Sequence, residues 1–409
     1  MNLFAEIREG FGISWDAIRA NKMRSALTTL GIVIGIVTVT LMGTAIEGLN
    51  RSFMQSISIL GADVFYVQRF NWINTSESDW LKTQKRRPIK LAEAEALARQ
   101  LTLAAAVAPS ADLMLPVKYQ RRSASSVFVV GTTEDFSAAG GTGVTEGRFL
   151  SGADAAGGRP VCVIGTDVAT NLFQNASPLG HRIKIGLQSF EVLGVLEKQG
   201  TFMGMFSLDN RIIIPLRQFM TAFRNDPELQ IQVKAQQLVQ LEEAREELRQ
   251  VMRRVRRLAP NEPDDFAINQ QDQFVEMFHK VAGTIAAIGL FITGLSLFVG
   301  GIGIMNIMFV SVAERTREIG IRKAIGAKRR TILLQFLIEA ASICLLGGLI
   351  GLGIAWPVTL VMQRFLPTTM SLTVAGIALL VSALTGIVSG FLPAWRAARM
   401  NPVDALRAE

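Results

Sequence analysis

The sequence is poor in the residues that enzymes and metal sites most often use. Its 409 residues include only two histidines and two cysteines. His181 and His279 have no Cys or His partner at metal-binding spacing, and no serine or cysteine has a plausible histidine base in its local sequence. Cys162 and Cys344 fall in segments of different character, which argues against a disulfide framework. The sequence therefore predicts no catalytic residue and no metal site.

Phosphate-binding loops are missing as well. No Gly-Lys dipeptide occurs, which excludes the loop Gly-x-x-x-x-Gly-Lys-Ser/Thr. The glycines at 141, 143 and 147 do not have dinucleotide-binding spacing. We therefore expect no cofactor bound by this chain and no ATP hydrolysis by that route.

What the sequence does contain is long runs without charge. A run of about 20 apolar residues is enough to cross the hydrocarbon core of a bilayer. Four such runs occur, at 25–46, 281–313, 331–363 (interrupted by Glu339) and 372–394. The first is longer than the apolar part of a signal peptide and lacks a small-x-small cleavage site, so we assign it as a span. The sequence predicts one N-terminal and three C-terminal transmembrane helices.

The positive charge is concentrated beside these runs. The formal net charge is +8, and most of the excess lies in 1–24, 313–330 and 395–409. Cytoplasmic loops of membrane proteins are enriched in Lys and Arg. We therefore expect a multi-pass membrane protein with both termini in the cytoplasm, in contact with lipid and not with nucleic acid.

The long segment between the first two spans predicts a water-exposed α+β domain in two lobes. The predicted strands are 64–68, 117–120, 127–130, 161–164, 183–185, 190–196, 212–214 and 231–234. The predicted helices are 91–101, 166–173 and 238–258. We expect a loop at 71–87 and glycine-rich connectors at 138–147 and 151–159.

These patterns give a complete division of the chain. We expect a cytoplasmic amphipathic helix at 1–24, spans at 25–49, 281–312, 331–362 and 372–394, an extracytoplasmic domain with stalk helices at 50–280, a cytoplasmic helix at 313–330 and a cytoplasmic tail at 395–409. The stalks are predicted because the apolar stripes of the first two spans continue through Phe53 and Ile57 and through Phe274 and Phe278. Three Gly-x-x-x-Gly pairs predict close helix packing, within the bundle or between copies.

One basic stretch between the second and third spans has two interpretations. Residues 314–330 carry seven cations with apolar residues interleaved, which predicts a helix along the membrane face. It can serve only as a topology signal, or it can be a docking helix for a soluble partner. Two acids among the arginines and two flanking glycines favour docking. Glu339, the one charge within the third span, is predicted to pair with Arg322, Arg329 or Arg330; an ion or proton site is the alternative.

The stretch Glu314-Arg-Thr-Arg-Glu-Ile-Gly-Ile-Arg-Lys-Ala-Ile-Gly-Ala327 resembles the MacB-type permeases of the ABC superfamily, a group that includes lipoprotein-releasing and FtsX-like members. Further similar motifs are Leu60-Gly-Ala-Asp63, Glu146-Gly-Arg-Phe149, Gln335-Phe-Leu-Ile-Glu-Ala340, Pro393-Ala-Trp-Arg-Ala-Ala398 and Asn401-Pro-Val-Asp-Ala-Leu-Arg407. The resemblance covers nearly the whole chain in the right order, and it implies a location in the bacterial cytoplasmic (inner) membrane.

The resemblance implies a non-catalytic permease whose coupling helix docks on an ATPase. The residues carried over to that helix are Glu314, Arg315, Arg317, Glu318, Gly320, Arg322, Lys323, Ala324, Gly326 and Ala327. It also implies a homodimer of permease chains with two ATPase subunits, which would bind the ATP and Mg. One predicted lobe is split between about 60–110 and 191–269, with a mostly β lobe inserted.

MacB itself carries its ATPase at the N-terminus of the same chain, whereas this sequence begins almost directly with membrane helix, so we expect the ATPase on a separate polypeptide. The expected function is mechanotransmission that drives efflux of a drug-like, peptide or lipid substrate, with a periplasmic adaptor and an outer-membrane channel as candidate partners. The alternatives are an FtsX-like transmitter that activates a cell-wall hydrolase and a lipoprotein-releasing permease.

Overall fold

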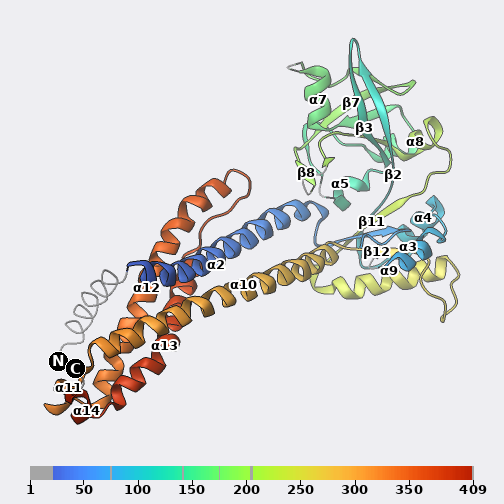
Figure 1. The fold of residues 1–409 in the computed structure, drawn as a ribbon. Coiled ribbons are helices and arrows are strands. Elements are labelled where there is room, and N and C mark those ends of the chain that lie inside the picture. Colours follow the sequence, from blue (N-terminus) through green and yellow to red (C-terminus); the bar gives the residue numbers. More distant parts are fainter. Residues whose placement is uncertain (1–21, 74–75, 141, 175, 203–205, 408–409) are drawn as a thin grey trace. The chain divides into compact units, whose positions relative to one another are not determined.

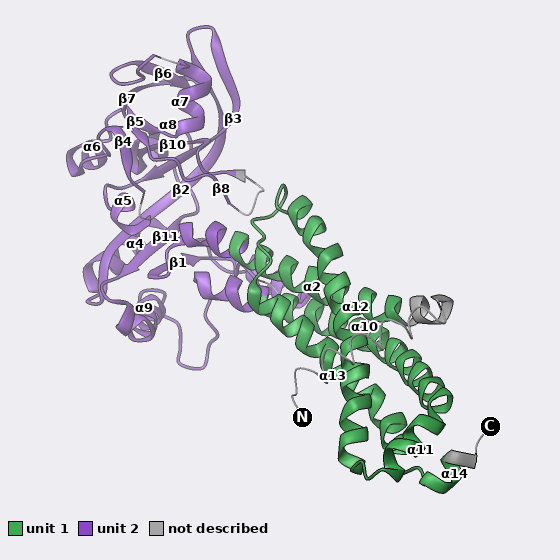
Figure 2. Cartoon of the chain, turned by 90° about the vertical axis from the view of Figure 1, so that its left-hand side faces the viewer, with its two compact units in different colours: residues 1–52, 279–409 green, residues 53–278 purple. Residues whose placement is uncertain are grey.

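A computed structural model gives the fold of residues 22–73, 76–140, 142–174, 176–202 and 206–407. The chain divides into two compact units, which Figure 2 colours separately. The helical unit comprises Met1–Ser52 and His279–Glu409, and the sheet unit comprises Phe53–Phe278. The amphipathic helix predicted at 1–24 lies, up to position 21, outside the described residues.

Four described helices are long and apolar enough to cross a membrane. They are α2 (Lys22–Ile57), α10 (Gln271–Glu314), α12 (Arg329–Met362) and α13 (Leu372–Arg399). Two short helices, α11 (Thr316–Ala324) and α14 (Pro402–Arg407), complete the helical unit. α2 and α10 have 36 and 44 residues, more than a bilayer requires. In the sheet unit the rings of Phe53 and Phe278, on α2 and α10, stack with centroids 4.4 Å apart.

Glycines set the spacing of the helices in the helical unit. A Cβ atom added to Gly31 would lie 3.0 Å from the Cα of Gly300, and one added to Gly386 would lie 2.7 Å from the carbonyl oxygen of Ala340. Contacts this short mean that the helix backbones touch directly. All three predicted Gly-x-x-x-Gly pairs face helices of the same chain. The hydroxyl of Ser382 adds a hydrogen bond of 2.6 Å from α13 to the Cys344 carbonyl of α12.

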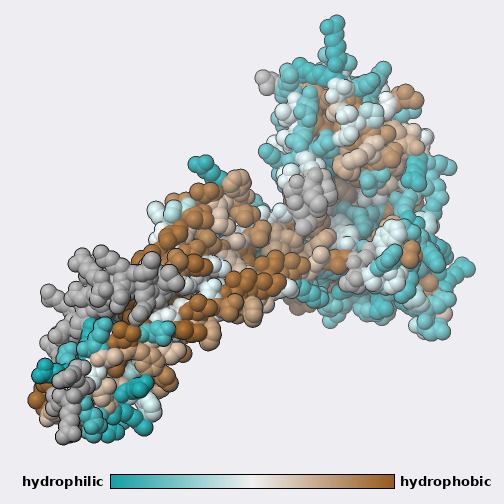
Figure 3. Space-filling model, viewed as in Figure 1, coloured by the Kyte–Doolittle hydropathy of each residue, from teal (hydrophilic) through white to brown (hydrophobic). Residues whose placement is uncertain are grey.

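The outward face of α10 is apolar. Ile288, Phe291, Leu295 and Phe298 are all more than half exposed and recur at alternating spacings of three and four residues. Figure 3 shows apolar side chains along this helix within the helical unit. Such a stripe suits lipid or the packing of a second helix.

Ten strands form the main sheet, in the order β12-β1-β11-β2-β3-β10-β5-β7-β4, with β6 beside β2 and β7. Their bounds are β1 Val64–Gln68, β2 Ala104–Tyr119, β3 Arg122–Thr132, β4 Val144–Gly147, β5 Val161–Ile164, β6 Arg182–Ile185, β7 Gln188–Leu196, β10 Arg211–Pro215, β11 Gln230–Ala235 and β12 Ala267–Asn269. A small hairpin pairs β8 (Thr201–Phe202) with β9 (Phe206–Ser207). The eight predicted strands are confirmed, although β2 begins 13 residues before the predicted start at 117.

Strand β2 joins the two lobes of the sheet unit. Its first part, through Ser110, pairs with β11, and its second part pairs with β3 and β6. The first lobe contains β1, β11 and β12, and the second lobe contains β3 to β7 and β10 (Figure 1). The sequence-based assignment of 191–269 to the first lobe is therefore wrong for β7 and β10. These strands pair with β5 and with β3 and β5, respectively, and the chain returns to the first lobe only at β11.

The helices of the sheet unit match the predictions in three places and contradict them in two. The predicted helices correspond to α4 (Leu91–Gln100), α7 (Thr166–Phe173) and α9 (Leu241–Val255), the last preceded by η2 (Leu238–Gln240). The predicted loop at 71–87 contains α3 (Glu77–Gln84), and the predicted connectors contain part of α5 (Asp135–Gly140), strand β4 and α6 (Gly152–Gly157). Both α3 and α6 begin at a serine whose hydroxyl accepts a backbone hydrogen bond, from Asp79 and Asp154 respectively. The remaining elements are η1 (Ser58–Leu60) and α8 (Leu216–Ala222).

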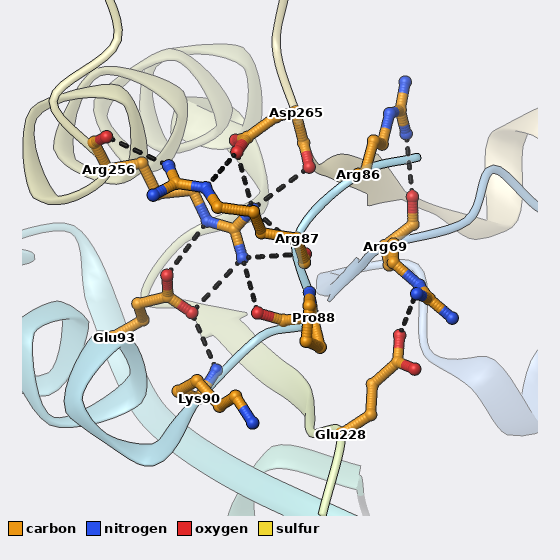
Figure 4. A network of polar contacts seen from close by, with 9 residues as sticks. All are labelled: Arg69, Arg86, Arg87, Pro88, Lys90, Glu93, Glu228, Arg256 and Asp265. Atoms are coloured by element: carbon orange, nitrogen blue, oxygen red, sulfur yellow. Dashed lines mark hydrogen bonds and ion pairs between the residues drawn. The ribbon is translucent and has the colours of Figure 1, made fainter. Parts of the chain in front are cut away.

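A buried arginine fixes the first lobe. The Arg256 side chain is fully buried after α9, and its guanidinium lies 3.0 Å from both the Glu93 and Asp265 carboxylates. It also donates hydrogen bonds to the carbonyls of Arg87 and Pro88 (Figure 4). Because both a cation and its carboxylates are desolvated, removal of the arginine would leave uncompensated charge. The network holds α4, α9 and the segment before α4 together.

Candidate functional site

The stretch predicted to dock a partner forms a short helix between two long ones. Helix α10 ends at Glu314, α11 follows after Arg315, and α12 begins at Arg329. The turn after α11 contains Gly326 with φ +102°. A side chain is strained at that backbone angle, so glycine suits this turn. The residues predicted from the motif therefore lie on a short helix and on the sharp bends at its two ends.

The inner face of α11 is anchored to the helical unit. Ile319 and Gly320 are buried. The Lys323 ammonium donates hydrogen bonds to the carbonyl oxygens of Ala398 (2.7 Å) and Met400 (2.5 Å), at the end of α13. A cation placed against the last carbonyls of a helix complements the helix dipole. Burial, together with the neighbouring Arg329 charge, lowers the pKa of Lys323 from its ordinary value.

Two more polar contacts tie the segment to α12. Arg322 donates a hydrogen bond to the side-chain oxygen of Gln335 on α12 at 2.8 Å and, within α11, another to Glu318 at 2.5 Å. Arg315, at the bend between α10 and α11, lies 3.4 Å from the Glu339 carboxylate. Glu339 therefore pairs with a basic residue at this end, as predicted, but the partner is Arg315 and not Arg322, Arg329 or Arg330. Arg315 sits on the preceding bend, a position that spacing along α12 does not reveal.

The outer face of α11 and its C-terminal turn are exposed and partly apolar. Arg317 and Ile321 lie one helical turn apart, and Ile325 follows one turn later with 81% of its surface exposed. Val403 of α14, which packs beside α11, is also exposed. The two isoleucines were absent from the predicted set, although an unburied apolar side chain in a basic segment is itself a signal for a binding surface.

The ten predicted residues thus separate into two groups. Gly320, Arg322 and Lys323 contact the rest of the helical unit, and Arg315 contacts α12. The others, Glu314, Arg317, Glu318, Ala324, Gly326 and Ala327, are exposed or partly exposed. The same end of the unit carries Lys328, Arg329 and Arg330 at the start of α12 and Arg396 and Arg399 at the end of α13.

Two family models match successive parts of the chain. Residues 25–251 match the MacB-like periplasmic core domain, and residues 290–402 match the FtsX-like permease C-terminal domain. An N-terminal apolar helix, three C-terminal apolar helices and a β-rich domain between the first two spans define a membrane permease of the ABC-transporter type. The chain belongs to the MacB-like family of these permeases.

Alignments with two curated relatives extend over nearly the whole chain. It is 34% identical to the macrolide export ATP-binding/permease protein MacB of Rhodopirellula baltica, over 96% of this chain and 61% of that protein. It is also 34% identical to the pyoverdine export ATP-binding/permease protein PvdT of Pseudomonas savastanoi pv. phaseolicola, over 99% of this chain and 60% of that one. The chain thus spans about three fifths of the length of these relatives.

A solved structure is similar to part of this chain. The periplasmic region of MacB from Actinobacillus actinomycetemcomitans aligns with a TM-score of 0.45 and 18% identity. The alignment covers 56% of this chain and 98% of that structure.

Proposed function

We propose that the chain is the permease component of an ABC-type exporter and that α11 is its docking surface for an ATPase. The observation that carries this proposal is the division of α11 into an anchored inner face and an exposed outer face with Arg317, Ile321 and Ile325. A helix that served only to lie on the membrane surface would not need hydrogen bonds to two neighbouring helices. A helix that receives force from a partner would need them.

The basic residues at this end support a cytoplasmic location for α11. Lys and Arg are enriched on the cytoplasmic side of membrane proteins. The start of α12 and the end of α13 both place cations here, which supports an orientation with α11 and the C-terminus in the cytoplasm. The sheet unit would then be periplasmic, as the name of the matching domain model suggests.

The contacts of α11 supply a route for motion. A shift of α11 would act on α12 through Arg315 and Arg322, on α13 through Lys323, and on α10 through the bend at Arg315. Because α10 is one continuous helix of 44 residues that begins in the sheet unit, displacement at its cytoplasmic end would reach Gln271. In this mechanism ATP hydrolysis changes the sheet unit without a wide channel through the bilayer.

Two permease chains would form the complex. An exporter of this type uses a pair of ATPases, and the exposed stripe at Ile288, Phe291, Leu295 and Phe298 has the spacing of a helix–helix seam. The names of the relatives, which refer to macrolide and pyoverdine export, favour efflux over activation of a hydrolase or release of lipoproteins.

The test is to replace Ile325 by Asp in affinity-tagged protein and isolate the complex from the membranes of its own host. We expect loss of the co-purified ATPase and of ATP hydrolysis in the isolated complex, because the carboxylate would be desolvated at the interface. The matched control is Leu187→Asp, since Leu187 is 99% exposed in the sheet unit. If I325D retained both the ATPase and full activity, the docking assignment would be wrong.

A further inference from the structure

A cavity of about 510 Å³ lies where the two lobes of the sheet unit meet. Strands of both lobes contribute to its lining, with Tyr66 on β1, Gln232 on β11, Phe128 on β3 and Arg211 on β10. Ligand cavities commonly have 300–1,000 Å³ and combine apolar walls with a few polar groups. The size and position of this one are therefore those of a small-molecule site.

One wall of the cavity is aromatic. The rings of Tyr66 and Trp72 have centroids 4.9 Å apart, and Trp72 stacks on Phe274 at 5.1 Å. Phe202 of β8 meets Phe274 edge to face. Trp72, Phe202 and Phe274 are only partly buried, so ring surface remains available. Such a wall offers stacking and apolar contact to a planar molecule.

The polar groups of this wall are already satisfied. Tyr66 donates its hydroxyl to the Leu60 carbonyl at 2.8 Å, and the Trp72 indole donates to Gln68 at 2.9 Å. Gln68 in turn is hydrogen-bonded to Gln230. These residues therefore give the cavity shape and apolar surface and leave little unused hydrogen-bonding capacity.

Arg211 is different, because part of its guanidinium has no partner. Its Nη2 donates to the neutral side chains of Gln199 (2.5 Å) and Thr142 (3.4 Å), whereas its buried Nε has no hydrogen bond among the described residues. The Asp209 carboxylate, two residues away, accepts hydrogen bonds from the backbone of Gln199 and Gly200. Burial lowers the pKa of Arg211 from its ordinary value, and the Asp209 charge opposes this. The cation is thus desolvated without a bound carboxylate.

A second unsatisfied group lines the same cavity. Gln232 is 7% exposed, and its side-chain oxygen has no hydrogen-bond partner among the described residues. A buried polar atom without a partner costs about 1–3 kcal/mol, so a ligand donor in this position would relieve a penalty. The carboxylate that lines the cavity, Asp112, does not pair with Arg211.

We propose that this cavity binds an aromatic organic anion that also carries a hydrogen-bond donor. The anionic oxygens would accept hydrogen bonds from Arg211, the donor would reach Gln232, and the ring system would lie against Trp72 and Phe274. Ile59 and Leu60 after α2, and Phe274 in the first turns of α10, also line the cavity. An occupant therefore contacts the ends of both long helices within the sheet unit.

The test uses 6-hydroxy-2-naphthoate as the probe and its neutral amide as the matched compound. Binding to the full chain in lipid nanodiscs is measured by titration calorimetry, with empty nanodiscs as the blank. We expect the anion to bind about tenfold or more tightly than the amide, since a hydrogen bond to a charged group contributes roughly that factor. Equal affinity for the two compounds, or no binding of either, would overturn the proposal.

Three variants locate the site. Arg211→Met should remove the preference for the anion, and Arg121→Gln, which changes an exposed arginine outside the cavity lining, should leave it intact. Val130→Trp places a bulky ring in the cavity from β3 without altering Arg211 and should weaken the binding of both compounds. If R211M does not fold, V130W decides the question. Unchanged binding by a folded V130W protein would contradict the site, as would loss of the preference in R121Q.

Discussion

Replacement of Gly386 by Ala tests how tightly α12 and α13 pack. The added Cβ atom would lie 2.7 Å from the Ala340 carbonyl oxygen, 2.8 Å from the Ala341 Cα and 2.9 Å from the Cys344 sulfur. Ordinary van der Waals contacts of a Cβ lie at 3.4–4 Å. The two nearest neighbours are backbone atoms, so movement of the Cys344 side chain would not relieve the clash and the helices must separate.

The structure also sets the size of the effect. A separation of about 0.5–1 Å forfeits a quarter to a half of the dispersion energy at the contact. Overpacking of this kind costs about 1–3 kcal/mol. The matched control is Gly376→Ala on the same helix, where a Cβ would meet nothing within 4 Å. Removal of that glycine should stabilise the helix by up to about 1 kcal/mol.

Reversible unfolding in mixed detergent micelles, followed by far-UV circular dichroism, measures both free energies. We expect G386A to lower the free energy of unfolding and G376A to leave it unchanged or raise it. If the two substitutions have the same effect, the close approach of α12 and α13 is not what restricts position 386, and the packing described for the helical unit is wrong.

Three further predictions concern polar contacts. Arg256→Met should lower the free energy of unfolding by about 3 kcal/mol or more, because Glu93 and Asp265 lose their buried cation. The control Arg99→Met removes an exposed pair with Glu95 and should change the free energy of unfolding by less than about 1 kcal/mol. Equal losses for the two variants in chemical denaturation would contradict the network. The hydrogen bond from Arg148 holds the pKa of the Asp154 carboxyl well below its usual range. The stability that this carboxylate contributes is therefore present above its unfolded-state pKa near 3.8 and declines as the pH falls below that value. In urea titrations, the difference in free energy of unfolding between the wild type and Asp154→Asn should shrink on acidification. A difference that stays constant with pH would contradict the role of the Arg148–Asp154 pair. Lys323→Met should reduce ATP hydrolysis by the isolated complex without loss of the ATPase subunit, since Lys323 faces α13 and not the partner; loss of the subunit instead would place Lys323 at the interface.

The sequence was sufficient for the parts of the fold that depend on local pattern. Charge-free runs predicted the four long helices, and β1 and α7 match their predicted ranges because a buried strand and an amphipathic helix carry their own periodicity. The first half of β2 was missed because Ala104–Ser110 is rich in alanine, which has low strand propensity. Its pairing with β11, more than a hundred residues later, makes it a strand.

The helix that carries the candidate site was predicted, but the orientation of its side chains was not. The motif located α11, yet charges occur all around this helix, so periodicity did not show that Lys323 faces inward and Ile325 outward. The Arg315–Glu339 pair depends on how α10 bends relative to α12, which is a property of the tertiary structure. The Arg211 cavity was missed for the same reason, since its lining comes from strands of both lobes.

The central claim is that the exposed face at the end of α11 binds an ATPase in the cytoplasm. The most direct measurement places a photoreactive amino acid at position 325 of the full-length protein, irradiates intact cells and identifies the adduct by mass spectrometry. Position 187, on the sheet unit, serves as the control. The account predicts an adduct at 325 with a protein segment that contains the phosphate-binding loop of an ABC ATPase, and none of that kind at 187. An adduct at 325 with a periplasmic protein, or with lipid alone, would contradict it.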